Sequence, residues 1–215
     1  MIIERYVFDI IDSNMYVCIE DKEALIIDPF KCEIAKKRLL DSGVNKVFII
    51  LTHEHLDHIS GANYYSEFNS IVYAGEKCKN IVENRLRKLK VQFASIFIMA
   101  NDDEKRRVSE FLKDIYEIKI DRALYDGEHI AFGKHLLTVV SAQGHSQGSI
   151  VVFLDKLAVF TGDSLLPDRE VITDLPGGSK TMYEAVTIPI LQRINREAVV
   201  YPGHGEVTLF VNIWR

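Results

Sequence analysis

Apolar residues follow two patterns along the chain, one typical of β-strands and one typical of α-helices. Near the N-terminus, runs rich in β-branched and aromatic residues are separated by short turn-forming segments. These runs predict three strands, at residues 3–11, 15–20 and 24–27. Because the intervening turns are short, we expect an antiparallel meander.

Beyond residue 30, helical patterns alternate with continuous apolar runs of strand length. The sequence predicts a helix at 33–41, a strand at 47–51, a helix at 60–68 and a short strand at 71–74. The second half repeats this order, with strands at 136–140, 157–161 and 198–201 and a helix at 181–194. Sheets covered by helices account for the alternation, so we expect an α/β (α+β) fold with layered sheets.

Residues 76–121 are rich in charge and in helix-forming residues around the apolar segment 91–99. We expect two helices here, inserted into a single domain that spans residues 1–215. Two roles are open for this insertion. It forms either a helical layer packed on the sheet, with its charges in solvent, or a cap or homodimer surface built on Phe93, Phe97 and Met99.

Composition agrees with a cytoplasmic enzyme domain. At 215 residues, with 47% hydrophobic and 27% charged content, the chain can bury a large core without disulfides. Cys18, Cys32 and Cys78 are isolated and odd in number, which favours a reducing compartment. No signal-like N-terminus or membrane-length apolar run occurs in the sequence. A net charge of −5 argues against a nucleic-acid partner.

Candidate chemistry is concentrated in seven residues that follow apolar strands and lie beside glycine or in a dense cluster. They are His53, His55, Asp57, His58, His145, Asp163 and His204. Imidazoles and carboxylates suit zinc, iron and manganese, and seven ligands are too many for one closed tetrahedral site. The pattern therefore predicts two adjacent metal ions. In an extended segment, the spacing of His53 and His55 points both imidazoles the same way, while Asp57 and His58 face elsewhere.

A single histidine is more often an ordinary hydrogen-bonded or surface residue than a metal ligand. The combination of five histidines and two aspartates in matching contexts favours the metal site instead. His129 and His135 lie outside the pattern, beside turn-like segments, and we interpret both as surface or hairpin residues.

The motifs His-x-His-x-Asp-His, Gly-His-Ser, Gly-Asp-Ser and Pro-Gly-His-Gly occur here in an order that resembles the metallo-β-lactamase-fold hydrolase superfamily, most closely its glyoxalase II-like branch. The resemblance spans nearly the whole chain and implies a four-layer αββα sandwich. It implies that Asp163 bridges two metals, one held by His53, His55 and His145 and the other by Asp57, His58 and His204. It also implies that Asp28 supports the site without binding metal.

Several positions differ from that branch. Aspartate at position 163, in place of the cysteine or serine of antibiotic-hydrolysing members, argues against β-lactam substrates. Gln143 and Ser179 replace a proline and an aspartate that are common in the branch. The sequence ends eleven residues after His204, before the C-terminal helical region that binds the glutathione thioester in glyoxalase II enzymes, so we do not expect glutathione specificity.

Charge and metal chemistry predict a mechanism. Asp57, Asp163 and a bridging hydroxide only partly neutralise two divalent cations, so the site suits an anionic or carbonyl-bearing small molecule. We expect a dinuclear hydrolase, with zinc first and iron or manganese as alternatives, in which the hydroxide attacks a thioester, lactone or related ester. Asp57 is the candidate catalytic residue, orienting the hydroxide and moving its proton.

Two other functions are open. The motif also resembles persulfide dioxygenases, in which one iron would be held by His53, His145 and Asp163. Alternatively, the chain is a non-catalytic module whose metals only tie loops together. This hypothesis ranks last, because structural metal sites are usually closed by four ligands.

Overall fold

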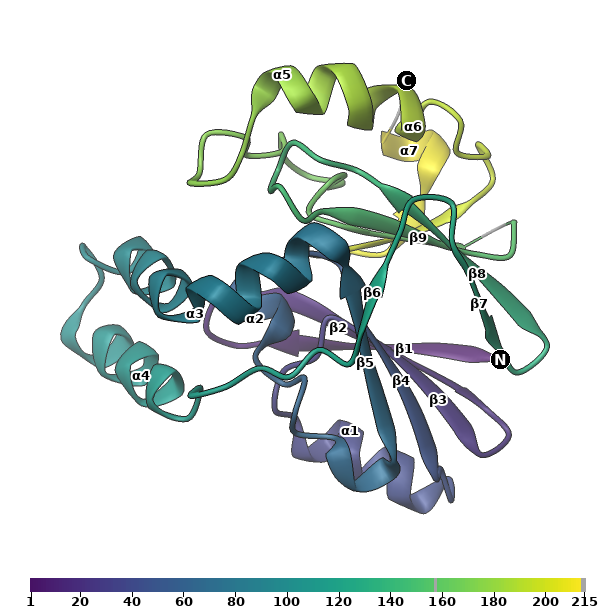
Figure 1. The fold of residues 1–215 in the computed structure, drawn as a ribbon, viewed down its shortest axis with the longest axis horizontal. Helices are drawn as coiled ribbons and strands as arrows, with labels where there is room; N and C mark the ends of the chain where they lie inside the picture. The colour runs from purple at the N-terminus through teal and green to yellow at the C-terminus, as the bar shows by residue number, and fades with distance from the viewer. Residues whose placement is uncertain (157, 214–215) are drawn as a thin grey trace.

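Two mixed six-stranded sheets form the centre of the molecule in a computed structural model that describes residues 1–156 and 158–213 (Figure 1). The first sheet follows chain order and contains β1 (Ile2–Phe8), β2 (Ser13–Glu20), β3 (Glu23–Ile27), β4 (Lys46–Leu51), β5 (Ser70–Gly75) and β6 (Arg122–Leu124). Strands β1 to β3 pair antiparallel, as the meander predicted, and β3 to β6 pair parallel.

The second sheet runs in reverse chain order and is antiparallel except for one pair. It contains β12 (Thr208–Leu209), β11 (Val199–Pro202), β10 (Ala158–Gly162), β9 (Ile150–Leu154), β8 (His135–Ser141) and β7 (His129–Phe132). Strands β10 and β11 are parallel, so their C-terminal ends lie at the same edge. Leu157, the first residue of the strand predicted at 157–161, lies outside the described residues.

Alternation along the strands explains the layers. In β4, Phe48 and Ile50 belong to the core between the sheets, whereas Val47 and Ile49 pack with helices on the outer face. In β10, Phe160 faces the core between the sheets and Val159 faces the other helical layer. Because each sheet is apolar on both faces, helices must cover both outer faces. The expected αββα sandwich is confirmed.

Helices of the first layer are α1 (Glu33–Asp41), α2 (Leu56–Ile59), α3 (Glu76–Ile96) and α4 (Asp102–Lys113). Those of the second layer are α5 (Lys180–Met182), η2 (Tyr183–Thr187), α6 (Ile188–Leu191) and α7 (Phe210–Ile213), and α5 and α6 lie over the second sheet at the top of Figure 1. No described helix is both long and apolar enough to cross a membrane.

The helix predicted at 60–68 is wrong. A short helix, α2, begins earlier inside the histidine motif, and residues 60–65 form turns that lead to the 3-10 helix η1 (Ser66–Phe68). Gly61 explains the interruption, because its amide donates to the Pro29 carbonyl and a Cβ there would lie 2.5 Å from the Phe30 backbone. The chain is therefore held against residues 29–30, whereas a regular helix over 60–68 would move it away from them.

Two further boundaries differ from prediction. The first strand ends at Phe8, because a turn follows in which the Asp12 amide donates to the Phe8 carbonyl and Asp12 has φ of 58°. The helix predicted at 181–194 ends at Leu191 and contains the π-helical turn η2. Pro189 has no amide to donate four residues back, which accounts for the local change in hydrogen bonding.

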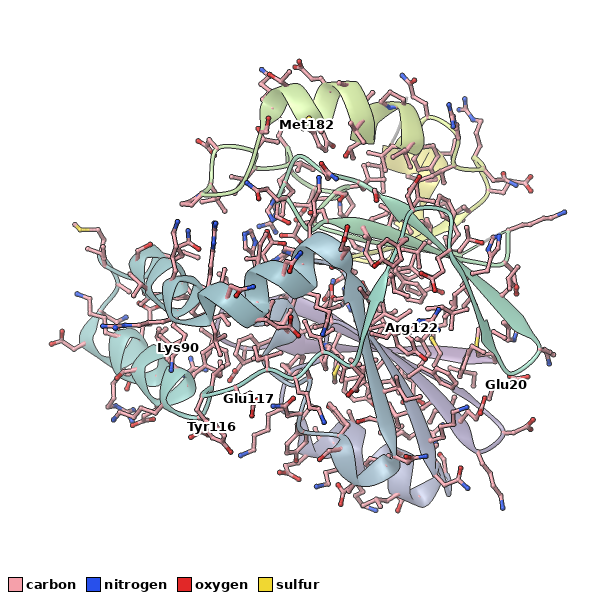
Figure 2. All side chains as sticks on the ribbon, viewed as in Figure 1. Glu20, Lys90, Tyr116, Glu117, Arg122 and Met182 are labelled. Atoms are coloured by element: carbon pink, nitrogen blue, oxygen red, sulfur yellow. The ribbon has the colours of Figure 1, made fainter. Side chains whose placement is uncertain are left out.

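The two helices expected within 76–121 are present as α3 and α4. Leu89 and Phe93 on α3 pack into the first helical layer, and the Phe93 ring lies 5.3 Å from that of Phe111 on α4. Lys90 Nζ donates to the Ile115 carbonyl at 2.7 Å and ties α3 to the segment after α4 (Figure 2). The helices therefore form a packed pair, as the layer hypothesis requires.

Candidate metal centre

All seven predicted ligand residues lie together at one edge of the sandwich. His53, His55, Asp57 and His58 follow β4 of the first sheet, and His145, Asp163 and His204 follow β8, β10 and β11 of the second. Backbone hydrogen bonds hold these loops in place: Ile150 donates to Thr52 at 2.9 Å, and Gly203 donates to Gly162 at 2.8 Å. The two sheets thus contribute ligand candidates to the same site.

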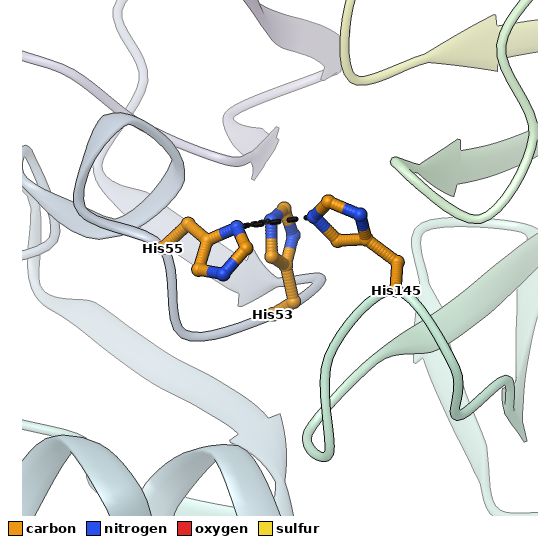
Figure 3. Close-up of side chains that lie close together, drawn as sticks. All are labelled: His53, His55 and His145. Atoms are coloured by element: carbon orange, nitrogen blue, oxygen red, sulfur yellow. Dashed lines mark hydrogen bonds between the residues drawn. The ribbon is translucent and has the colours of Figure 1, made fainter. Parts of the chain in front are cut away.

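Three imidazoles form the first group, His53, His55 and His145 (Figure 3). The Nδ1 atom of His55 lies 3.1 Å from His53 Nε2 and 3.0 Å from His145 Nε2. Three ring nitrogens therefore converge on one point between the two sheets.

A second group contains Asp57, His58 and His204. Asp57 Oδ2 lies 3.1 Å from His58 Nε2 and 3.4 Å from His204 Nε2. Asp163 lies between the groups, with Oδ1 at 3.6 Å from His58 Nε2 and Oδ2 at 3.5 Å from both His145 Nε2 and His204 Nε2. Asp163 is therefore the carboxylate placed to contact both groups.

Hydrogen bonds on the far side of the rings set which nitrogen faces the centre. His145 Nδ1 donates to the Ile172 carbonyl at 2.8 Å, and His204 Nδ1 donates to the Asp12 carbonyl at 3.2 Å. Since a carbonyl only accepts, each ring must carry a proton on Nδ1, which leaves Nε2 as the nitrogen that faces the centre and can bind a metal. Metal-binding histidines usually donate their other ring N–H to a carbonyl or carboxylate in this way.

Asp28 sets the same tautomer for two other rings. Its Oδ2 accepts from His58 Nδ1 at 3.0 Å and from Thr52 Oγ1 at 2.6 Å. Because the Thr52 hydroxyl proton is used in this way, Thr52 Oγ1 accepts from His53 Nδ1 at 3.0 Å. Asp28 is buried and has φ of 54°, a left-handed conformation uncommon for a residue with a side chain. Its other oxygen, Oδ1, accepts from the Thr52 amide at 2.7 Å, so both oxygens are occupied, which fits a supporting role.

The donor set fits bound cations. With protons on the Nδ1 atoms of His53 and His145, two Nε2 lone pairs point at His55 Nδ1, which can donate a proton to only one of them. Asp163 Oδ1 is buried and makes no hydrogen bond within the described part of the chain. A cation would satisfy both the surplus lone pair and the carboxylate oxygen.

Electrostatics of the protein alone agree with this arrangement. Burial, reinforced by His58, holds the pKa of His53 well below its usual value, and burial lowers the pKa of His55 to about 4. Although burial opposes it, the imidazoles of His58 and His204 lower the pKa of Asp57 well below its usual range. His53 and His55 are therefore neutral imidazoles and Asp57 is a carboxylate at neutral pH, which are the forms that bind metal.

One residue that connects two ligand-bearing loops was missed by sequence reasoning. Glu54, between His53 and His55, is buried, and its Oε2 accepts from Ser146 Oγ at 2.8 Å and from the Gly148 amide at 3.1 Å. It thereby joins the His53–His55 segment to the loop that carries His145. A charged side chain that points opposite to two ligands in an extended segment was the available signal.

As expected, His129 and His135 are outside the site, where they contact Thr138 and Asp155.

A pocket of about 290 Å³ opens over the ligand candidates. Its floor contains His55, Asp57, His145, Asp163 and His204. Its walls come from two distant segments, helix α3 and residues 166–176. The insertion therefore borders the site as well as packing on the sheet, so the two roles considered for it are not exclusive.

The sandwich and its His/Asp groups define a class of metal-dependent hydrolases and oxidoreductases. The chain belongs to the metallo-beta-lactamase superfamily, whose family model matches residues 9–204. Members of this superfamily are mostly enzymes that bind divalent metals.

Similar proteins carry different activities in their names. The chain is 28% identical to an uncharacterized protein of Mycobacterium tuberculosis, over 97% of this chain and 92% of that one. It is 26% identical to the hydroxyacylglutathione hydrolase GloC of Haemophilus influenzae (88% and 83% covered) and 25% identical to the human mitochondrial persulfide dioxygenase ETHE1 (86% and 60% covered). The crystal structure of the BLEG-1 B3 metallo-beta-lactamase superposes with a TM-score of 0.77 and 27% identity, over 98% of this chain and 95% of that one.

Proposed function

We propose that this protein is a dinuclear metal hydrolase that cleaves a thioester, a lactone or a related ester. The observation that carries the proposal is the position of Asp163, whose two oxygens lie within 3.6 Å of ring nitrogens from both ligand groups. One carboxylate shared by two groups is the arrangement expected for two ions side by side. The similarity to a hydroxyacylglutathione hydrolase supports hydrolysis.

Two divalent cations at these groups would supply an activated water at neutral pH and polarise the scissile carbonyl. Zinc fits the mixed imidazole and carboxylate donors, and iron or manganese fits them as well. The chain's own contribution is orientation. Hydrogen bonds that the rings donate to Thr52, Asp28, Ile172 and Asp12 hold them in place. Asp57 lines the pocket as a carboxylate able to accept a proton from the attacking water.

A persulfide dioxygenase-like reaction is the second candidate, favoured by the 25% identity to the human enzyme of that name. It would use a single iron at His53, His145 and Asp163. His145 Nε2 and Asp163 Oδ2 are 3.5 Å apart, close enough to share one ion. This function would leave the group of Asp57, His58 and His204 without a metal, which is why we rank it second.

Metal content and a substrate panel separate these functions. Elemental analysis of protein purified without added metal is paired with assays on thioesters, lactones, phosphodiesters, β-lactams and persulfides. Two metals per chain with turnover of an ester or thioester supports the proposal. One iron with oxygen consumption on a persulfide overturns it in favour of the second candidate. Metal-dependent melting with no turnover of any substrate overturns both and favours a non-catalytic module.

A further inference from the structure

The pocket over the metal centre has a polar floor and walls that are apolar except for Gln92, Ser95 and Arg169. Helix α3 contributes Leu89, Phe93 and Ile96, which lie four and then three residues apart and therefore share one helical face. Across the pocket, the segment after Asp163 contributes Leu166, Ile172, Leu175 and Pro176. Two apolar surfaces thus face each other above the ligand candidates.

We propose that these walls hold a hydrocarbon chain, so that the substrate is an ester or thioester of a medium-length aliphatic acid. This inference rests on the proposed hydrolase function. The wall from Leu89 to Ile96 spans about 10 Å along the helix, which matches an extended octanoyl chain. The volume of about 290 Å³ is near the lower end for small-molecule sites and suits one such chain.

Charge on the walls supports an apolar occupant. Among the described lining residues, Arg169 is the only lysine or arginine. Asp168 already pairs with it, at 3.1 Å from Nε and 3.2 Å from Nη2. A substrate with several carboxylates would therefore meet little opposite charge on these walls, whereas a hydrocarbon chain would lose only water on entering.

Exposure at the pocket edge supports the same occupant. Ile96 is 54% exposed and Ile172 is 48% exposed, and they stand on the two opposite walls. A chain lying between them would remove both side chains from water, which adds favourable burial on both walls at once.

Hydrolysis of a matched ester series tests the proposal. The zinc-loaded protein is assayed with acetyl, butyryl, hexanoyl and octanoyl esters of p-nitrophenol. We expect kcat/KM to rise about threefold to fourfold for each added methylene that the walls cover. Hydrolysis of the acetyl ester with a flat or falling series would overturn the inference and leave the hydrolase function standing.

Variants on α3 add a test based on the ratio of kcat/KM for two esters, because partial misfolding would lower both values equally and leave the ratio unchanged. Ile96→Gln should lower the octanoyl-to-acetyl ratio of kcat/KM about tenfold, the effect of about two buried methylenes. Ile98→Gln is the matched control, because Ile98 is 64% exposed near the same helix end and lies outside this pocket's lining. Gln92→Leu makes the wall more apolar and should raise the ratio several-fold. An unchanged ratio in both Ile96→Gln and Gln92→Leu would overturn the inference.

Binding without turnover separates the two proposals. Calorimetric titration of the zinc-loaded protein with 1-octanol should show binding that Ile96→Gln weakens and Gln92→Leu strengthens. If octanol binds in this order while no ester is hydrolysed, the pocket assignment stands and the hydrolase proposal fails. If octanol does not bind, the pocket assignment fails even where the acetyl ester is hydrolysed.

Discussion

Ligand geometry at this site depends on residues that do not themselves face the centre. Asp28 accepts from both His58 and Thr52, and Thr52 in turn accepts from His53. One buried carboxylate therefore sets the proton positions of two imidazoles.

The seven candidate ligands could be found from the sequence because their types and spacings are distinctive. Thr52 could not, since threonine after a strand is common and only the structure shows its hydroxyl between two site residues.

Glu54 should be a positioning residue that the site needs for metal affinity. Glu54→Leu leaves Ser146 Oγ and the Gly148 amide without their carboxylate acceptor, so we expect zinc affinity to fall about 10- to 100-fold. The free energy of unfolding should fall by about 2 kcal/mol. Competition with a chelating dye measures the affinity, and urea unfolding measures the stability.

Two variants sharpen this test. Glu54→Gln keeps one acceptor oxygen and should lose less zinc affinity than Glu54→Leu. Glu110→Leu, at a carboxylate that is 57% exposed, is the surface control and should leave zinc affinity unchanged. Equal zinc affinity in Glu54→Leu and the wild type would contradict the positioning role.

Cysteine reactivity should differ sharply among the three thiols. Burial raises the pKa of Cys18 to about 12 and the pKa of Cys78 well above its usual value, while Cys32 is only half-buried. The thiolate is the reactive form, so at pH 8 the two buried thiols are protonated and shielded. Ellman's reagent should modify one thiol per native chain and three after unfolding in guanidinium. Cys32→Ser should abolish the native reaction; fast modification of all three native thiols would refute this picture.

At the scale of elements, the strands buried on both faces and the helix at 33–41, which is α1, were predicted closely. The apolar runs at 47–51 and 71–74 correspond to β4 and β5 within one residue at each end, because a strand buried on both faces is continuously apolar. The helix expected at 60–68 failed because Gly61 packs against the Phe30 backbone, a long-range contact that local propensity does not contain. The pocket walls were missed for the same reason, since α3 and residues 166–176 meet only in the fold.

The start of α4 offers a local test of element stability. Asn101 Oδ1 accepts from the Glu104 amide at 2.9 Å, and Glu104 Oε2 accepts from the Asn101 amide at 3.1 Å, which forms a capping box. Asn101→Ala should lower the free energy of unfolding by about 1 kcal/mol. Asn101→Asp keeps a side-chain acceptor and should remain near wild type in urea unfolding. Equal stability of the alanine and aspartate variants would argue that the cap contributes nothing.

For the whole molecule, the site is a junction between the two sheets. His53, His55 and His58 come from the first sheet, whereas His145 and His204 come from the second. Any cation held by the first group, or by Asp57, His58 and His204, must therefore connect the sheets. The sandwich could be predicted from the alternating elements and from the family resemblance. The shared residue types and contexts predicted that the loops converge, but the division of the ligands into two groups came only through that resemblance, because sequence spacing carries no information on contacts between sheets.

Metal removal should therefore weaken the whole fold and not only the site. Stripping metal with a chelator removes the connection between the sheets and leaves lone pairs and Asp163 Oδ1 buried without a partner. Zinc at about 100 times its Kd should restore about 2.7 kcal/mol, which for a chain of this size raises Tm by about 5–10 °C. Scanning calorimetry of the stripped and zinc-loaded protein measures the shift. His204→Ala should reduce the shift because it removes one ligand of the second group, whereas His129→Ala, outside the site, should leave it unchanged. A Tm that does not respond to zinc would mean that the two sheets hold together without any ion between them.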